Sequence, residues 1–398
     1  MSETQKHTKP NVPNLRFPGF SGEWEKYTIG QICTIIGGGT PDTNTNKYWN
    51  GDIQWFTPSE VGKDKYVLNS NRTISIDGLK NSSAKLLPPY SVLLSSRATV
   101  GECSINLKEC CTNQGFQSAV PNESITSTEF LYYRLLTHKH EFIKKACGST
   151  FLEISAKQVS RLNTFIPSRS EQEKIASVLS LIDQRISIQN RVIERYESLI
   201  RAIILRSQSS SSTRKVYLRE ILNERKELNE HGYDICSVSV SKGVVNQVEY
   251  LGRSFAAKET AHYNVVHKGD IVYTKSPTGE FPYGIIKQSY LDAPVAVSPL
   301  YGVYEPIDYL TGVYLHHFFC SPQNAKNYLH KLIQKGAKNT INITNQHFLD
   351  NYISIPESDT LQSIVAIIET LSKRVDLEKE LLSLFIEQKA YLMSNMFI

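Results

Sequence analysis

The short motifs in this sequence that could perform chemistry each lack a residue on which that chemistry depends. Residues 37–39 are three consecutive glycines followed by Thr40, but the Gly-Lys-Ser/Thr ending with which a phosphate loop binds a nucleotide is missing. A Gly-x-Ser-x-Gly nucleophile elbow is absent. Aspartate and glutamate form no compact cluster of the kind that holds a catalytic Mg²⁺. These absences favour a binding protein over an enzyme, and we predict no catalytic residues.

One further run has the outline of a catalytic element. Leu87-Pro88-Pro89-Tyr90 resembles the Asn/Asp-Pro-Pro-Tyr element of DNA amino-methyltransferases. The leading side chain of that element accepts a hydrogen bond from the target amino group, and leucine has no acceptor. No glycine-rich strand–turn element for a methyl donor lies nearby, so we interpret the run as an ordinary turn.

Cysteine and histidine lack the spacing of metal ligands or disulfides. The seven cysteines are odd in number and include no Cys-x-x-Cys pair, which argues against a zinc site and against a disulfide framework. His316 and His317, like His138 and His140, have no companion cluster of carboxylates or cysteines. We expect these histidines on the surface or in the core, and we expect no metal site.

Length and composition describe a globular protein with two domains. A chain of 398 residues exceeds what one hydrophobic core usually serves, and 40% apolar residues is a globular composition. No stretch approaches the roughly 20 apolar residues that cross a bilayer, and the N-terminus lacks the apolar core of a signal peptide, so we expect a cytoplasmic protein without a membrane partner. A net charge of +5 is smaller than that of a self-sufficient nucleic-acid binder. A DNA-binding protein with this charge would need a local basic groove or partner subunits that share the phosphate contacts.

Two long helices give the clearest pattern in the sequence. Residues 171–206 contain no proline or glycine, and their apolar residues recur in steps of 4 and 3 over four heptads, as in the seam of a coiled coil. The chain end repeats this pattern at a constant offset without a gap, as from Ile175 to Ile364. Gln189 and Glu378 occupy the same slot of the two seams, where a polar group can fix register or partner. The seam residues expected to pair the helices or to contact a partner are Ile175, Leu179, Ile182, Ile186, Ile193 and Tyr196 in the first helix and Ile364, Ile368, Leu371, Val375, Leu382 and Phe385 in the second.

Between these helices the sequence predicts sheet and shorter helices. Short apolar runs bounded by Gly, Pro, Asn or Asp are typical of strands. A helix is expected over 127–145, with counterparts over 309–320 and 323–334 in the second half. The strands expected are 32–36, 53–56, 92–94 and 117–120 in the first half and 271–274, 284–286, 295–297 and 302–304 in the second.

Several blocks of the first half resemble the target recognition domain of the specificity subunits of type I restriction–modification systems. The stretch from Ile166-Pro167 through residues 171–176 (EQEKIA) to residues 182–186 (IDQRI) is similar to the helical spacer of that family. The second half departs from the pattern, since residues 274–278 (TKSPT) stand where the first half has residues 95–99 (SSRAT). The blocks that carry the resemblance are residues 38–41 (GGTP), 48–55 (YWNGDIQW), 57–59 (TPS), 93–101 (LLSSRATVG) and 112–116 (TNQGF).

The resemblance implies an α+β fold with an internal pseudo-twofold repeat. Two target recognition domains of mixed strand and helix are joined by two long antiparallel coiled-coil helices. The expected boundaries are an N-terminal arm at 1–22, recognition domains at 23–168 and 217–356, a central spacer helix at 169–206, a Ser-rich linker at 207–216 and a C-terminal spacer helix at 357–398.

The resemblance also implies a function and partners. The chain would be a non-catalytic specificity subunit that reads a bipartite target in double-stranded DNA and scaffolds two methyltransferase subunits and the restriction subunits. AdoMet, ATP and Mg²⁺ would bind those partners, and this chain would hold no cofactor.

Candidate DNA contacts are polar side chains expected on loops. Arg97 suits a bidentate pair with guanine, and Asn113 or Gln114 suits adenine. The other candidates, suited to phosphates or base edges, are Thr40, Thr57, Ser59 and Thr99 in the first half and Lys275, Ser276, Tyr283, Lys335 and Lys338 in the second.

Two alternatives remain open from the sequence. The first is a coiled-coil adaptor whose two domains bind ligands other than DNA, which a test of DNA binding with the methyltransferase subunit would separate. The second is a fused restriction–methylation enzyme with divergent catalytic motifs, against which the missing motifs argue.

We expect the paired helices to set the length of the DNA segment that lies unread between the two specific blocks. Inserting four residues within 187–192 should move one domain by about 6 Å and rotate it by about 40°. Because DNA rises about 3.4 Å and turns about 34° per base pair, the unread gap should lengthen by about one or two base pairs. Sequencing the methylated sites of such a variant tests this expectation. An unchanged gap, or a change in either specific block, would contradict it.

Overall fold

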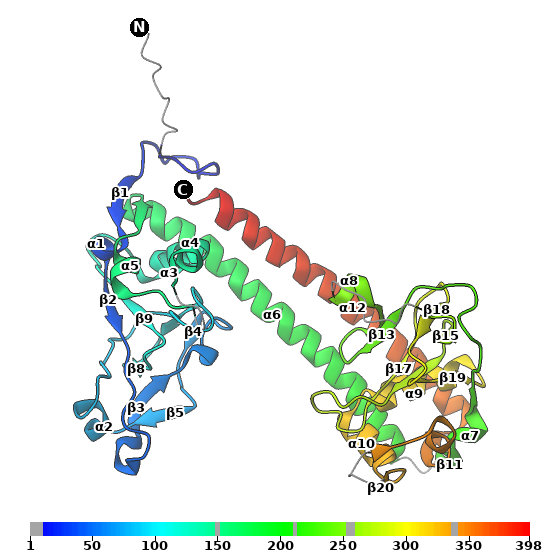
Figure 1. The fold of residues 1–398 in the computed structure, drawn as a ribbon. Helices are drawn as coiled ribbons and strands as arrows, with labels where there is room; N and C mark the ends of the chain where they lie inside the picture. Colours follow the sequence, from blue (N-terminus) through cyan, green and yellow to red (C-terminus); the bar gives the residue numbers. More distant parts are fainter. Residues whose placement is uncertain (1–10, 148–151, 210–212, 252–258, 336–340) are drawn as a thin grey trace. The chain divides into compact units, whose positions relative to one another are not determined.

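The computed structural model describes residues 11–147, 152–209, 213–251, 259–335 and 341–398 (Figure 1). The chain forms two compact units, unit 1 (Met1–Gln189 and Leu381–Ile398) and unit 2 (Asn190–Glu380). The two long helices are α6 (Arg169–Gln208) and α12 (Ser358–Asn395), and each unit contains a segment of both.

Unit 1 is built around a five-stranded sheet in the order β2-β9-β6-β7-β4. A three-stranded sheet, β5-β3-β8, and the antiparallel pair β1-β10 complete its strands. Its elements before α6 are β1 Glu25–Thr28, α1 Ile29–Ile32, β2 Cys33–Gly37, η1 Asn46–Tyr48, β3 Trp49–Phe56, η2 Pro58–Glu60, β4 Tyr66–Val67, β5 Arg72–Ile74, α2 Ile76–Lys80, β6 Val92–Leu94, β7 Cys103–Asn106, β8 Cys110–Thr112, β9 Gln117–Pro121, α3 Thr128–Thr137, α4 Lys139–Lys145, α5 Ala156–Ser160 and β10 Asn163–Ile166.

The central strand β6 explains how unit 1 forms its core. All three of its residues are fully buried, because the sheet is covered on both faces. Val92 and Leu94 point to the cluster that includes α3 and the start of α6, whereas Leu93 points to the opposite cluster with Phe56 and Phe116. Successive side chains of a strand alternate between the faces of the sheet, so an uninterrupted apolar run requires two apolar surroundings.

Unit 2 repeats this plan with a four-stranded sheet in the order β12-β19-β16-β17. The pairs β11-β22, β13-β14, β15-β18 and β20-β21 surround it. Its elements before α12 are β11 Thr213–Tyr217, α7 Leu218–Ile221, β12 Leu222–Glu224, β13 Cys236–Ser239, β14 Gly243–Asn246, α8 Gln247–Leu251, β15 Asn264–Val266, β16 Ile271–Thr274, β17 Ile285–Gln288, β18 Val295–Val297, β19 Gly302–Pro306, α9 Tyr309–Phe319, α10 Pro322–His330, β20 Gln334–Lys335, β21 Ile341–Asn342, α11 Asn345–Phe348 and β22 Tyr352–Pro356.

The element order confirms the predicted internal repeat. In each unit a first strand pairs antiparallel with the strand that precedes the long helix, as β1 with β10 and β11 with β22. The short helices that follow and precede these strands also correspond. Helices α1 and α7 begin at Ile29 and Leu218, and α5 and α11 begin at Ala156 and Asn345, with the same offset that relates the two seams. The two units therefore share one fold although few residues are identical.

The predicted seam is the buried side of both long helices. In unit 1, Lys389 Nζ lies 2.6 Å from Asp183 Oδ1, and the Arg185 guanidinium lies 5.8 Å from the ring centre of Phe385. The reversed order of these partners makes the two helix segments antiparallel. All twelve predicted seam residues are buried or half-buried. Their packing role follows from this burial, while contact with a partner protein stays a prediction.

The expected single helix over 127–145 is wrong. The structure has α3, which ends at Thr137, and α4, which begins at Lys139. The Thr137 hydroxyl donates to the Arg134 carbonyl at 2.8 Å, and His138 caps the end of one helix and the start of the other. A threonine that bonds to the preceding turn in this way competes with the regular helix bonds.

Other predictions hold with shifted ends. The eight expected strands are present as β2, β3, β6, β9, β16, β17, β18 and β19, and the counterpart helices as α9 and α10. The Ser-rich linker expected over 207–216 is shorter, because α6 continues to Gln208 and Thr213–Tyr217 pairs with β22. The described part of the N-terminal arm is anchored on unit 1, where Arg16 Nη2 lies 2.8 Å from Glu171 Oε2.

Of the described helices, none is long and apolar enough to cross a membrane.

The histidines expected in the core or on the surface divide between these two places, since His138 is buried and His140 is exposed. Burial, with a further contribution from the Arg134 cation, lowers the pKa of His138 to about 3.

The buried His138 predicts a loss of stability on acidification. The native state keeps this ring neutral, whereas the unfolded chain binds a proton below about pH 6.5. The stability contribution is therefore complete above the unfolded pKa and is lost as the pH falls toward the folded one, at up to about 1.4 kcal/mol per pH unit. Urea denaturation of wild type and of His138→Gln is measured at pH 7.5, 6.0 and 5.0. The unfolding free energy of the wild type should fall relative to that of His138→Gln as the pH is lowered. His140→Gln is the control, and a difference that stays constant for His138→Gln would contradict the expectation.

Candidate functional site

Five of the predicted DNA contacts of the first half come together at one edge of unit 1. Strands β3 and β8 are parallel and end side by side at Phe56 and Thr112. Because both strands end at this edge of the sheet, the segment with Thr57 and Ser59 lies beside the segment with Asn113 and Gln114. The Thr40 hydroxyl donates to Gln114 Oε1, which brings the third segment to the same place.

The glycine run is what allows this close approach. Gly39 N donates to the Thr112 carbonyl at 2.8 Å. A methyl group on Gly38 would lie 2.0 Å from the Asn113 carbonyl oxygen and 2.4 Å from that of Thr112. Only glycine fits at this position, because the two backbone segments touch.

The turn between β6 and β7 adds the two remaining candidates, Arg97 and Thr99. Ser96 N donates to the Gly115 carbonyl at 2.7 Å, which joins this turn to the segment with Asn113 and Gln114. Ala98 has a φ of +58°, in the left-handed region that side chains rarely adopt. All seven first-half candidates therefore belong to one continuous group of loops.

Several hydroxyl and amide groups in these loops are already engaged within the protein. Thr57 Oγ1 donates to Glu60 Oε2 at 2.6 Å, and Asn113 Oδ1 accepts from Gly115 N at 2.8 Å. The Ser59 hydroxyl lies 3.1 Å from Thr57 Oγ1 and donates to it, because the Thr57 proton is already engaged by Glu60. Thr57, Ser59 and Asn113 thus hold the loops in shape, with the Asn113 amide nitrogen still able to donate.

Two residues near these loops escaped the sequence analysis. Arg72, which is exposed, lies with its guanidinium 3.6 Å from the ring centre of Trp49 and 5.5 Å from that of Trp55. Trp55 Nε1 donates to the Gly39 carbonyl at 2.9 Å, so this arginine is tied to the same loops. Glu153 pairs with Arg97, with 2.8 Å between Oε2 and Nη2. The positions of Arg72 and Glu153 beside these loops depend on strand pairing between residues that are distant in the sequence. No local pattern in the sequence indicates either residue.

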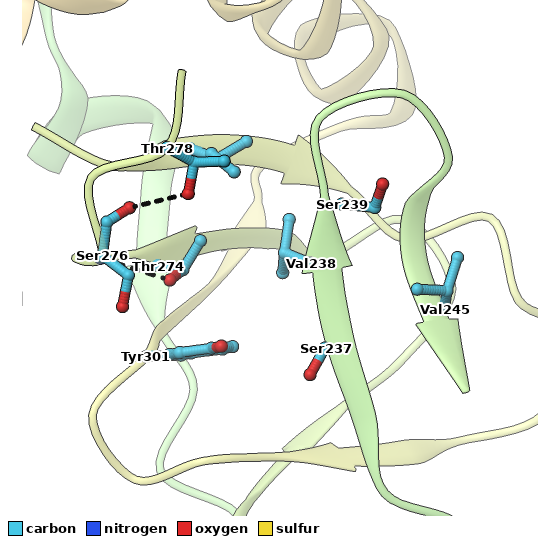
Figure 2. A pocket seen from close by; sticks show the side chains of 9 residues that line it. Ser237, Val238, Ser239, Val245, Thr274, Ser276, Thr278 and Tyr301 are labelled. Atoms are coloured by element: carbon cyan, nitrogen blue, oxygen red, sulfur yellow. Dashed lines mark hydrogen bonds between the residues drawn. The ribbon is translucent and has the colours of Figure 1, made fainter. Parts of the chain in front are cut away.

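In unit 2 the loop between β16 and β17 borders a pocket of about 220 Å³ (Figure 2). On one side of the pocket lie the side chains of Ser276 and Thr278, which belong to this loop, and that of Tyr301. Val238 and Ser239 of β13 lie on the opposite side. No charged side chain is among its lining residues, so its hydroxyl and methyl groups suit a neutral polar edge better than a phosphate. The lining residues are Ser237, Val238, Ser239, Val245, Thr274, Ser276, Thr278, Ile285 and Tyr301.

The other second-half candidates are less closely grouped. Lys275 adjoins the pocket in sequence and is half-buried, and this burial lowers its pKa. Tyr283 is not a lining residue, and its ring centre lies 5.9 Å from that of His330. Lys338 lies outside the described residues, as does the side chain of Lys335 in β20.

The two groups of loops occupy equivalent places in their units. Strand β6 lies between β9 and β7, and β16 lies between β19 and β17, so the turn with Arg97 corresponds to the loop with Lys275 and Ser276.

Within the described part of the chain, no cluster of three or more His, Cys, Asp or Glu residues could hold a metal ion.

Comparison with known protein families places both units in one family. The family model described as Type I restriction modification DNA specificity domain matches residues 21–197 and 219–384. The match includes both groups of loops and most of both long helices.

Two curated relatives agree in type with this match. The chain is 36% identical over 180 residues to the MjaIX type I restriction enzyme specificity subunit of Methanocaldococcus jannaschii, covering 44% of this chain and 41% of that protein. It is 28% identical over 169 residues to the EcoR124I/EcoR124II specificity subunit of Escherichia coli, covering 41% of each. The matched region thus spans less than half the length of these relatives.

Solved structures share the fold over 97% of this chain. The crystal structure of a type I restriction–modification S subunit from M. genitalium has a TM-score of 0.57 at 15% identity and covers 97% of this chain and 99% of that one. A chain from a structural study of type I complex assembly has a TM-score of 0.51 at 14% identity, with the same coverage. At these identities the likeness concerns the fold alone.

The close contact at Gly38 predicts a matched pair of effects. Gly38→Ala should lower the free energy of unfolding by about 1–3 kcal/mol, because the new methyl group overpacks against two carbonyl oxygens. Gly37→Ala should be nearly neutral, at about 0.5 kcal/mol or less, since its methyl group would lie an ordinary 3.4 Å from Gln117 Oε1. Urea denaturation of both variants measures the difference. Equal effects would show that the loops do not need this contact.

Proposed function

Since this chain belongs to the Type I restriction modification DNA specificity domain family, we propose that it selects the DNA target of a type I restriction–modification enzyme. The proposal assigns no catalytic step to the chain. Methyl transfer and cleavage, with AdoMet, ATP and Mg²⁺, belong to partner subunits.

The observation that carries the proposal is that both units present the same hairpin with different polar side chains. The β6–β7 turn carries Arg97, and the β16–β17 loop carries Lys275 and Ser276 beside an uncharged pocket. Base edges are distinguished by the donors, acceptors and methyl groups that meet them. Equivalent loops of unlike chemistry therefore suit two domains that read two different short sequences, and we infer a bipartite double-stranded target.

A surface for the partner subunits is supported by a second apolar pattern on the long helices. The residue immediately before a buried or half-buried seam position is exposed and apolar at several places on each helix. On a helix one residue corresponds to about 100° of rotation, so these side chains form a stripe beside the buried seam. We name it the outer stripe, and its exposed apolar members are Leu181, Ile188 and Leu199 on α6 and Ile367, Leu377, Leu381, Leu384 and Tyr391 on α12.

The outer stripe supports two identical partners. Exposed apolar patches of this kind mark interaction surfaces in soluble proteins. Ile188 and Leu377 are equivalent positions of the internal repeat, since each directly precedes the polar seam residue of its helix, Gln189 or Glu378. Each helix thus offers an exposed apolar side chain at one equivalent position, which suits two copies of one methyltransferase subunit.

The experiment that tests the proposal is reconstitution with the methyltransferase subunits. The complex should methylate DNA at a bipartite sequence, and the chain alone should neither methylate nor cleave. In the variant Ile188→Glu/Leu377→Glu, co-purification of the methyltransferase subunits and site-specific methylation should both be lost, because charges enter an apolar interface. The control Ser187→Glu/Lys373→Glu changes exposed polar residues off the stripe and should retain both.

Two results would contradict the proposal. Methyl transfer by the isolated, contaminant-free chain would place catalysis on this protein. Methylation without sequence preference by an intact complex would remove its role in target selection, and would favour an adaptor whose domains bind other ligands.

A further inference from the structure

A carboxylate lies beside the arginine that is the strongest candidate for reading a base. Arg97 Nη2 and Glu153 Oε2 are 2.8 Å apart, and their side chains are 43% and 36% exposed. Both side chains remain accessible from solvent, so the pair lies at the surface of the recognition loops rather than in the core.

The backbone fixes this pairing on both sides. Arg97 and Glu153 face each other in an antiparallel bridge, and Ile154 N donates to the Ser96 carbonyl at 3.2 Å. Glu153 is also bridged to Cys147, with N···O distances of 2.9 and 3.1 Å. The carboxylate is therefore held next to the guanidinium by the chain itself, and not only by the attraction between two flexible side chains.

The turn that carries Arg97 is equally constrained. Ser95 Oγ donates to the Arg97 carbonyl at 2.9 Å, and Thr99 N donates to the same carbonyl at 2.6 Å. Ser96 N is bonded to the Gly115 carbonyl. The origin of the side chain is therefore fixed, and its guanidinium is directed toward the Glu153 carboxylate.

A negative charge at this place has a cost that needs a compensating benefit. DNA phosphates repel a carboxylate, so a surface built only for affinity would not carry one. An unrestrained arginine binds a phosphate as readily as a base, and phosphate contacts contain no sequence information. A guanidinium held in one direction, with its charge partly balanced, favours guanine O6 and N7, which demand a fixed geometry.

We propose that Glu153 is a positioning residue that directs Arg97 to a base edge instead of a phosphate, and so raises sequence discrimination at the expense of overall affinity. This inference rests on the proposed function and concerns the block read by unit 1. It assigns Glu153 no direct contact with DNA.

The test uses Glu153→Gln in the complete complex with the methyltransferase subunits. Affinity for a specific and a non-specific duplex is measured over a series of salt concentrations. Non-specific affinity should rise, and the slope of log K against log salt should steepen by about 0.9, the value of one additional phosphate contact. The ratio of specific to non-specific affinity should fall roughly tenfold, within the range that one bidentate base contact supplies.

A matched control separates this effect from a change in charge. Glu123 also pairs with an exposed arginine of unit 1, with 3.4 Å between its Oε2 and Arg169 Nη2. Glu123→Gln makes the same change in net charge away from the recognition loops. It should leave both the ratio and the salt slope of the wild-type complex unchanged.

Coupling to Arg97 decides whether Glu153 acts through it. Arg97→Ala should lower specific affinity, and adding Glu153→Gln to that variant should have no further effect on the ratio. The inference is overturned if Glu153→Gln behaves like Glu123→Gln, or if it lowers the ratio equally without Arg97. It is also overturned if Glu153→Gln changes the preferred base at one position with the ratio retained, since Glu153 would then read cytosine N4 directly. A wild-type complex without sequence preference would instead refute the proposed function itself.

Discussion

The packing of the long helices against each recognition domain is the interaction on which the rest of the structure depends. In unit 1 the Tyr133 hydroxyl of α3 donates to Asp183 Oδ2 of α6 at 2.6 Å, and Lys389 of α12 reaches the same carboxylate. Lys65, in the segment before β4, donates to Ser180 Oγ at 2.6 Å. In unit 2 Ser207 of α6 and Tyr314 of α9 are 2.9 Å apart at their hydroxyl oxygens. The loops of each unit are therefore built on the same rigid elements that carry the outer stripe.

This arrangement gives the heptad pattern two consequences. The seam is the buried side of each helix, and its residues Ile175 and Leu179 join the core of unit 1. The outer stripe lies one residue away along the same pattern. A seam and a stripe with a common spacing cannot drift apart along a helix. The surface proposed for partners is thus fixed relative to the recognition loops of the same unit, which a subunit that directs an enzyme to a sequence requires.

The modest net charge of +5 is consistent with a chain that discriminates more than it attracts. Arg97 is balanced by Glu153, and the pocket beside Ser276 has no charged lining residue. Under the proposed function, other subunits would supply most of the affinity for the phosphate backbone, and a few side chains of fixed geometry would read the sequence. The exposed Arg72, stacked on Trp49, is a further candidate for a phosphate contact near these loops.

The sequence predicts the long helices and the repeat because both depend on spacing. An unbroken run of heptads leaves few alternatives, and one common offset persists at both ends of the repeat. Strands such as Cys103–Asn106, with buried serine and asparagine, have no apolar run and were not predicted. The break at His138 accompanies a hydrogen bond of the Thr137 side chain to the preceding turn, which the spacing of apolar residues does not indicate. The Arg97–Glu153 pair joins segments that only the folded backbone brings together, and the corresponding residues of unit 2 differ in type.

The exchange of one recognition domain tests the central claim most directly. Residues 23–168 would be replaced with the equivalent region of another family member, and the methylated adenines of a genome would be sequenced in cells that express this chain with its methyltransferase subunits. Because each unit reads through its own loops, one block of the target should change while the other block and the gap are retained. A simultaneous change in both blocks, or no change in either, would contradict the account.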